Sequence, residues 1–225
     1  MLAHVFSEVT KDNMFKKNLD TYKDRYKDVD KDTFIRIQKY MAKAGFSEKD
    51  VKKFRKEVDR ILNLPKETIK IVLYIIPETT PRPRYNFNSH NFYVKNAASN
   101  NQFMKILVEK EELLKNYIVT PCEFTCRLYF PIPSDMNRID TLLAEMGVIR
   151  PPIQKDWDNL GKTYSDMVQK WLLLNDALII KGTSEKYWSL KPRVEIEITY
   201  PTKIDCKYNE RKIKSSKTYQ EHMKG

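Results

Sequence analysis

Apolar residues recur at helical spacing in the first third of the chain. Within residues 32–45 they share one helical face, at Phe34, Ile37, Met41 and Ala44. Within residues 47–65 they form a second stripe, at Val51, Phe54, Val58, Ile61 and Leu62. The spacing predicts a pair of amphipathic helices. Such a pair serves either as a DNA-binding attachment or, more commonly, as a packing or dimerisation appendage.

The ends of the two predicted helices carry matching signals. Ser47 suits an N-cap because the carboxylate of Asp50 follows three positions later. Gly45 is a natural end for the first helix and Pro65 for the second. The polar residues 1–31 are either a loose arm or a further amphipathic helix.

From residue 67 onward the period of the apolar positions changes. Strands are expected at 68–77, around Phe92–Val94, and at 122–133, 177–189 and 192–200, with helices at 98–117, 135–147 and 158–174. In the last strand the apolar and the acidic residues alternate between two faces, as Val194, Ile196 and Ile198 against Glu195 and Glu197. The predicted fold class is α/β (α+β), a mixed β-sheet flanked by helices, with an added N-terminal helical region.

Basic charge is concentrated at the two ends of the chain. The whole chain has 41 Lys/Arg against 30 Asp/Glu, a net charge of +11. Residues 1–66 hold 17 against 11, residues 67–200 hold 17 against 16, and residues 201–225 hold 7 against 3. We expect these to be a helical N-terminal extension, a globular body and a basic C-terminal tail. The excess suits a polyanionic partner such as nucleic acid, although Lys-rich surfaces also aid solubility.

Other compositional features exclude several classes of protein. Glycine is scarce, and neither a GxGxxG stretch nor a Walker-type phosphate loop occurs. Cys122, Cys126 and Cys206 are odd in number and lack the spacing of a zinc site, while the first two share one face of a predicted strand. We expect core thiols in a reducing compartment. No signal-peptide pattern or membrane-length apolar run is present, so we expect a cytoplasmic protein.

The stretch QKDWDNLGK, residues 154–162, concentrates acid within this basic chain. Asp156 is expected on the extended approach to a helix and Asp158 at the helix N-cap, so that both carboxylates face one cavity. Lys162 lies four positions beyond Asp158, on the same helical face. Asp176 stands where the helix returns to a strand, which can bring its carboxylate beside the other two.

Three carboxylates without histidine or cysteine describe a site for a hard cation, Mg²⁺ with Mn²⁺ as a substitute. The pattern predicts Asp156, Asp158 and Asp176 as catalytic metal ligands. Lys162 would either neutralise the scissile phosphate or orient the attacking water, and Asp166, one turn further along, is a supporting residue. The plainer alternative is that Asp158 is only a helix cap paired with Lys162, while the other carboxylates are solvated.

The stretches KDWDNLGKTYSDMV and LNDALIIKGTSEKYWSLKPRVEIEI resemble the RusA family of Holliday junction resolvases. The family pattern is D-x-D-N-L-x-K, then a helix, then an acidic pair before a strand, then a lysine and a closing PRVEIEI. Upstream, RPRYNFNSHNFYVKN is similar to the family's Arg-Pro-rich loop, and a strand ending in YFPIP falls where the family has one. The resemblance covers roughly residues 68–200.

This resemblance implies a homodimeric endodeoxyribonuclease that cuts four-way DNA junctions with a divalent metal, in a bacterium or a phage-infected host. It gives the catalytic carboxylates as Asp156, Asp158 and Asp176 and the essential lysine as Lys162. Asn159 matches an asparagine that supports the turn. The nucleic-acid-binding positions that it implies are Arg82, Arg84, Lys95 and Lys186.

The sequence departs from the family pattern at two places. Trp157 stands where a small aliphatic residue is usual, and it either packs in the core, which is the commoner case, or stacks on a base. Asn175 replaces one member of the acidic pair, while Asp176 keeps the other. Two rival functions stay open, namely a nuclease for other branched DNA such as forks and flaps, and a non-catalytic DNA-binding protein of the same fold.

Overall fold

The computed structural model describes residues 31–79, 84–86, 91–93, 98–109, 117–169 and 171–223. The chain divides between Leu62 and Asn63 into two compact units. Within the described part of the chain, no helix combines the length and the apolar character that a membrane crossing requires.

The N-terminal unit contains the two helices that the apolar spacing predicts, α3 (Lys31–Lys43) and α4 (Glu48–Leu62). Gly45 ends α3 with a φ of +65°, a conformation that residues with a Cβ rarely adopt. Ser47 caps α4: its backbone N–H donates to the Asp50 carboxylate at 3.0 Å, and its hydroxyl accepts from the Asp50 N–H at 3.3 Å. The predicted end of the first helix at Gly45 and the predicted N-cap of the second helix at Ser47 are therefore confirmed.

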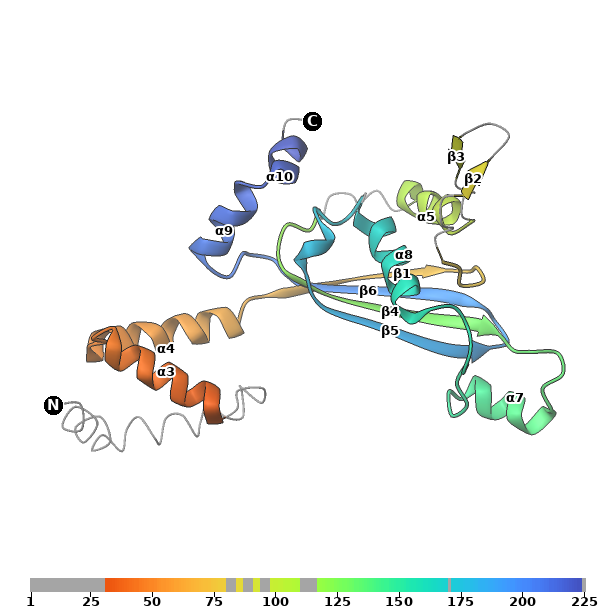
Figure 1. Ribbon diagram of the computed structural model, residues 1–225, viewed down its shortest axis with the longest axis horizontal. Coiled ribbons are helices and arrows are strands. Elements are labelled where there is room, and N and C mark those ends of the chain that lie inside the picture. Colours follow the sequence, from red (N-terminus) through yellow and green to blue (C-terminus); the bar gives the residue numbers. More distant parts are fainter. Residues whose placement is uncertain are drawn as a thin grey trace. The chain divides into compact units, whose positions relative to one another are not determined.

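The second unit is built on a four-stranded sheet in the order β1-β6-β4-β5 (Figure 1). The strands are β1 (Lys66–Leu73), β4 (Cys122–Pro131), β5 (Ile179–Ser189) and β6 (Arg193–Pro201). β4 pairs in parallel with β5, whereas β6 is antiparallel to both β1 and β4. The predicted mixed sheet is confirmed, and β5 lies at one of its edges.

Helices and a hairpin complete the second unit. They are β2 (Arg84–Asn86), β3 (Asn91–Tyr93), α5 (Ala98–Glu109), α7 (Arg138–Glu145), α8 (Trp157–Gln169), the short 3₁₀ helix η1 (Asp176–Leu178), α9 (Lys207–Lys214) and α10 (Lys217–His222). α8 contacts β4 and β5, α5 contacts β1, and α7 contacts β5. The segment predicted as a basic tail thus contains two short helices, and His222 of α10 stacks on the ring of Tyr117 at 3.9 Å.

One face of the sheet forms the core with α5 and α8. The alternation predicted for β6 is confirmed, because Val194, Ile196 and Ile198 are all buried. The helices add Phe103 from α5 and, from α8, Leu160, Tyr164, Met167 and Val168. Cys122 and Cys126 are buried among these side chains as free thiols, as expected.

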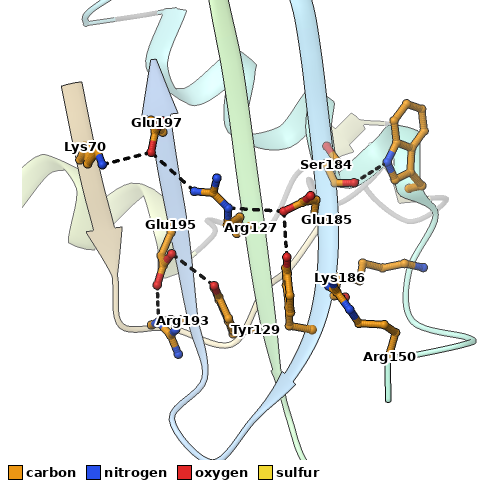
Figure 2. A network of polar contacts seen from close by, with 12 residues as sticks. Lys70, Arg127, Tyr129, Arg150, Ser184, Glu185, Lys186, Arg193, Glu195 and Glu197 are labelled. Carbon is orange, nitrogen blue, oxygen red and sulfur yellow. Dashed lines mark hydrogen bonds and ion pairs between the residues drawn. The ribbon is translucent and has the colours of Figure 1, made fainter. Parts of the chain in front are cut away.

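The opposite face of the sheet carries charged and aromatic side chains that pair with one another (Figure 2). Arg127 lies between the carboxylates of Glu185 and Glu197, with N–O distances of 3.4 and 3.6 Å. The rings of Tyr129 and Tyr187 stack at 4.8 Å. Further pairs on this face are Lys70–Glu197, Lys66–Glu123, Lys181–Glu123 and Arg193–Glu195. This face is therefore one of mixed charge and not a continuous basic surface.

Candidate active site

The acidic stretch forms the start of α8, but the helix begins one residue earlier than expected. The N–H of Leu160 donates to the carbonyl of Asp156 at 3.1 Å, so Asp156 precedes the first helical residue and Asp158 lies inside the helix. The prediction that Asp158 is the N-cap is therefore wrong. The extended geometry that would aim both carboxylates the same way does not apply to Asp158, because this residue lies inside α8.

The three predicted ligands are exposed and lie on two neighbouring elements. Asp156 and Asp158 are at the start of α8, and Asp176 is the first residue of η1, which contacts α8. Asn175 caps η1, since its side-chain oxygen accepts from the N–H of Ala177 at 2.8 Å. The asparagine that replaces a carboxylate thus has a structural role at this turn.

The donor set has the chemistry of a hard-cation site, because it offers carboxylate oxygens and no sulfur or imidazole. Among the described residues, no three His, Cys, Asp or Glu side chains lie close enough together to hold a metal ion. The carboxylates of Asp156, Asp158 and Asp176 thus lie on neighbouring elements but do not converge on one point. Their assignment as ligands stays a prediction.

Neighbouring residues on α8 surround the acidic pair. The side-chain amide of Asn159 donates to Asp156 Oδ2 at 3.1 Å, and its role as a supporting residue of the site stays a prediction. Lys162 is exposed and stands one turn after Asp158, while Asp166 follows on the next turn and is half-buried.

The turn before α8 has an unusual backbone. Lys155 has a φ of +44°, and it is the sole residue other than glycine with a positive φ in the described part of the chain. Left-handed backbone at a residue with a Cβ costs on the order of 1–3 kcal/mol, and it persists where surrounding contacts enforce it. The strained residue directly precedes Asp156, at the point where the chain turns into α8.

Two residues of the edge strand β5 contact this turn. The ammonium of Lys186 donates to the carbonyl of Gln154 at 3.0 Å and lies 3.5 Å from the carbonyl of Lys155. The carbonyl of Ser184 accepts a hydrogen bond from the indole N–H of Trp157 at 2.8 Å. In Figure 2 this hydrogen bond is the dashed line that starts at Ser184. β5 therefore holds the chain on both sides of Asp156.

Trp157 adopts an intermediate role between the two that the sequence left open. Its side chain is 57% exposed, so it is not a core residue, yet its indole N–H is bound to β5. The backbone of α8 approaches β5 closely one turn later: a Cβ on Gly161 would lie 2.6 Å from Ser184 Oγ. The absence of a side chain at Gly161 thus allows the tight contact that brings Trp157 within reach of the strand.

Arg150 is a further residue at this edge. Its guanidinium donates to the carbonyls of Gly147 at 3.0 Å and of Lys186 at 2.9 Å, and it lies 3.5 Å from the ring centre of Tyr187. Figure 2 shows Arg150 beside Lys186. No sequence motif marked Arg150 or Ser184, because both act through contacts that depend on the folded strand.

The structure describes the four predicted DNA-binding positions to different extents. Arg82 and Lys95 lie outside the described residues, and the backbone of Arg84 belongs to β2 although its side chain is not described. Lys186 is half-buried and bound to the turn before α8. DNA binding by all four stays a prediction.

Comparison of the sequence with known families identifies the class of protein to which the chain belongs. The profile of the family "Endodeoxyribonuclease RusA" matches residues 75–199, more than half of the chain. The chain therefore belongs to the RusA family of endodeoxyribonucleases. It is also similar to the "Uncharacterized protein YqaN" of Bacillus subtilis (strain 168), with 25% identity over 136 residues that cover 59% of this chain and 96% of that protein.

Proposed function

We propose that this protein is a metal-dependent endonuclease that cuts four-way DNA junctions by paired phosphodiester hydrolysis. The supporting observation is the RusA family match, which spans the acidic turn of α8 and the 3₁₀ helix with Asp176. The three carboxylates occupy the positions of the family's D-x-D-N-L-x-K pattern and its acidic residue before a strand.

In this proposal Asp156, Asp158 and Asp176, which lie on two neighbouring elements, would hold a divalent cation, Mg²⁺ or Mn²⁺. When bound, such a cation would supply positive charge to stabilise the phosphate in the transition state and would lower the pKa of water. Asn159 orients Asp156 through its amide. Lys162, exposed on the same helix, neutralises the scissile phosphate or orients the attacking water.

A homodimer is part of the proposal. A four-way junction has two-fold symmetry, and two symmetric cuts require two active sites held at a fixed separation. The proposed setting is the cytoplasm, where chromosomal and phage DNA form such junctions.

The test compares cleavage and binding of a synthetic junction by full-length variants. Asp156→Asn, Asp158→Asn and Asp176→Asn should each abolish Mg²⁺-dependent cleavage while junction binding survives, because they remove ligands and no DNA contact. Asp135→Asn, an exposed residue in the loop after β4, is the control for loss of one negative charge. Near wild-type cleavage by any of the three variants would remove that residue from the ligand set.

Substrate class is tested with a panel of junctions, forks, flaps and linear duplex. Paired symmetric nicks in the junction alone would support resolution of four-way junctions. Preferential cutting of forks or flaps would assign the same chemistry to another branched DNA. Binding without cleavage in either Mg²⁺ or Mn²⁺ would leave a non-catalytic DNA-binding protein.

A further inference from the structure

The turn that carries the acidic pair is held by one short piece of the edge strand. Ser184 and Lys186 are two residues apart on β5, so their carbonyls point to the same edge and their side chains to the same face. Lys186 donates into the turn before Asp156, at Gln154, and Ser184 accepts from the residue after it, Trp157.

We propose that Lys186 is a positioning residue of the active site, whose ammonium fixes the left-handed turn before Asp156. This inference rests on the proposed nuclease function, because it concerns the placement of the carboxylates that would bind the cation. Lys186 touches neither substrate nor cation in this proposal. It acts through the carbonyls of Gln154 and Lys155.

The direction of the side chain supports positioning over direct contact with DNA. Lys186 shares its face of β5 with Trp188, which is 6% exposed and belongs to the core. Lys181 points to the opposite face, where its side chain is 69% exposed and pairs with Glu123. The ammonium of Lys186 thus lies on the side of α8 and already donates to the carbonyls of the turn.

The strand at Lys186 is itself fixed from outside. Arg150 donates to the Lys186 carbonyl at 2.9 Å and to the Gly147 carbonyl at 3.0 Å, and its guanidinium lies over the ring of Tyr187. Contacts therefore run from Arg150 through the strand at Lys186 to the carbonyls of the turn. A donor on a rigid strand can enforce a backbone conformation that the turn would not adopt alone.

Loss of the ammonium should release this conformation. Without a partner for the carbonyls of Gln154 and Lys155, the turn is free to relax to negative φ. The carboxylate of Asp156 then moves relative to Asn159, its hydrogen-bond partner, and the indole of Trp157 changes its environment at β5. Supporting residues of this kind typically change metal affinity or activity by roughly 10–100-fold when removed.

The first experiment measures single-turnover cleavage and binding of a junction by full-length protein. Lys186→Met, which keeps the length of the side chain, should lower the cleavage rate about 10–100-fold and raise the Mg²⁺ concentration for half-maximal rate, with unchanged junction affinity. Lys181→Met, on the same strand, is the control for loss of one positive charge. Lys186→Arg keeps donors at this position and should restore most of the rate.

A direct DNA contact would give a different result. Lys186→Met would then weaken binding, make the dependence of log K on log salt shallower by roughly 0.9, and leave the rate at saturating protein unchanged. That outcome would overturn the proposal.

The second experiment needs neither metal nor DNA. Protein labelled with 5-fluorotryptophan should give separate ¹⁹F resonances for Trp157, Trp171 and Trp188, and Trp157→Phe identifies the first. Lys186→Met should shift or broaden the Trp157 resonance and leave that of Trp171 in place. Arg150→Met, which acts on the strand from outside the turn, should perturb the same resonance. Lys181→Met should not.

The two experiments separate failure of this inference from failure of the proposed function. An inactive wild-type protein would refute the nuclease, while the ¹⁹F spectra would still report on the turn. An unperturbed Trp157 resonance in both Lys186→Met and Arg150→Met would overturn the positioning role, whatever the cleavage assay shows.

Discussion

The C-terminal segment carries six exposed basic residues, one before α9 and five on α9 and α10. They are Lys203, Lys207, Arg211, Lys212, Lys214 and Lys217. Two of them are paired within their own helices, since Lys214 lies 2.7 Å from Glu210 and Lys217 lies 3.6 Å from Glu221. The other four, on and just before α9, are the stronger candidates for sequence-independent phosphate contact. We therefore choose them for substitution, in preference to deleting the segment, because His222 is packed on Tyr117.

The expected effect follows from the number of DNA phosphates that these four side chains neutralise. Each neutralised phosphate contributes roughly 0.9 to the slope of log K against log salt, so replacing all four residues by glutamine would make the slope shallower by about 3.6. Over a fourfold increase in salt, the affinity of the wild type should then fall about 150-fold more than that of the variant with four glutamines. Binding titrations of a junction and of linear duplex across a salt series measure this difference.

The matched control replaces Lys214 and Lys217, the two ion-paired lysines, by glutamine. This double variant should change the slope less per residue, because each lysine already has a carboxylate partner. An unchanged slope in the fourfold variant would show that α9 makes no phosphate contact. A weakening confined to the junction, with duplex binding intact, would mean that the segment reads DNA shape.

Two further predictions concern the core of the second unit. Tyr164→Phe removes a fully buried hydroxyl, which accepts a hydrogen bond from the N–H of Glu78 at 3.1 Å. The free energy of unfolding, measured in urea, should fall by about 1 kcal/mol. An unchanged free energy of unfolding would mean that water replaces the lost hydrogen bond at no cost. Burial raises the pKa of the Cys122 thiol to about 11 and raises the pKa of the Cys126 thiol further. A disulfide reagent at pH 8 should therefore modify Cys206, the least buried thiol, first in the native protein. All three thiols should react only in urea. Equal native rates for the three cysteines, followed by mass spectrometry, would contradict this.

Local patterns in the sequence were sufficient for much of the fold. The alternation of Val194 and Glu195 along β6 predicts both the strand and its two faces, because side-chain direction in a strand is set by position alone. Ser47 and Gly45 predict the ends of two helices, since capping involves residues three or four apart. The pairing order of the strands required the structure, because it depends on contacts between distant segments.

The candidate site was only partly predictable for the same reason. The spacing of Asp156 and Asp158 identified the acidic turn, but the start of α8 was expected one residue too late. The turn is shaped by Lys186 and Ser184, about thirty positions further along the chain, and by the left-handed backbone of Lys155. None of these influences has a signature in the residues next to the turn.

The hydrogen bonds along β5 also limit how two copies of this protein can associate through their sheets. The outer edge of a sheet can take up a strand from a second chain, which is a route both to assembly and to aggregation. On β5 the carbonyls of Ser184 and Lys186 are already bound by Trp157 and Arg150 of the same chain. A second chain could not add a strand there without displacing an indole and a guanidinium. Addition of a strand at this edge is therefore opposed at two successive outward-facing residues, and the proposed dimer would have to use other surfaces.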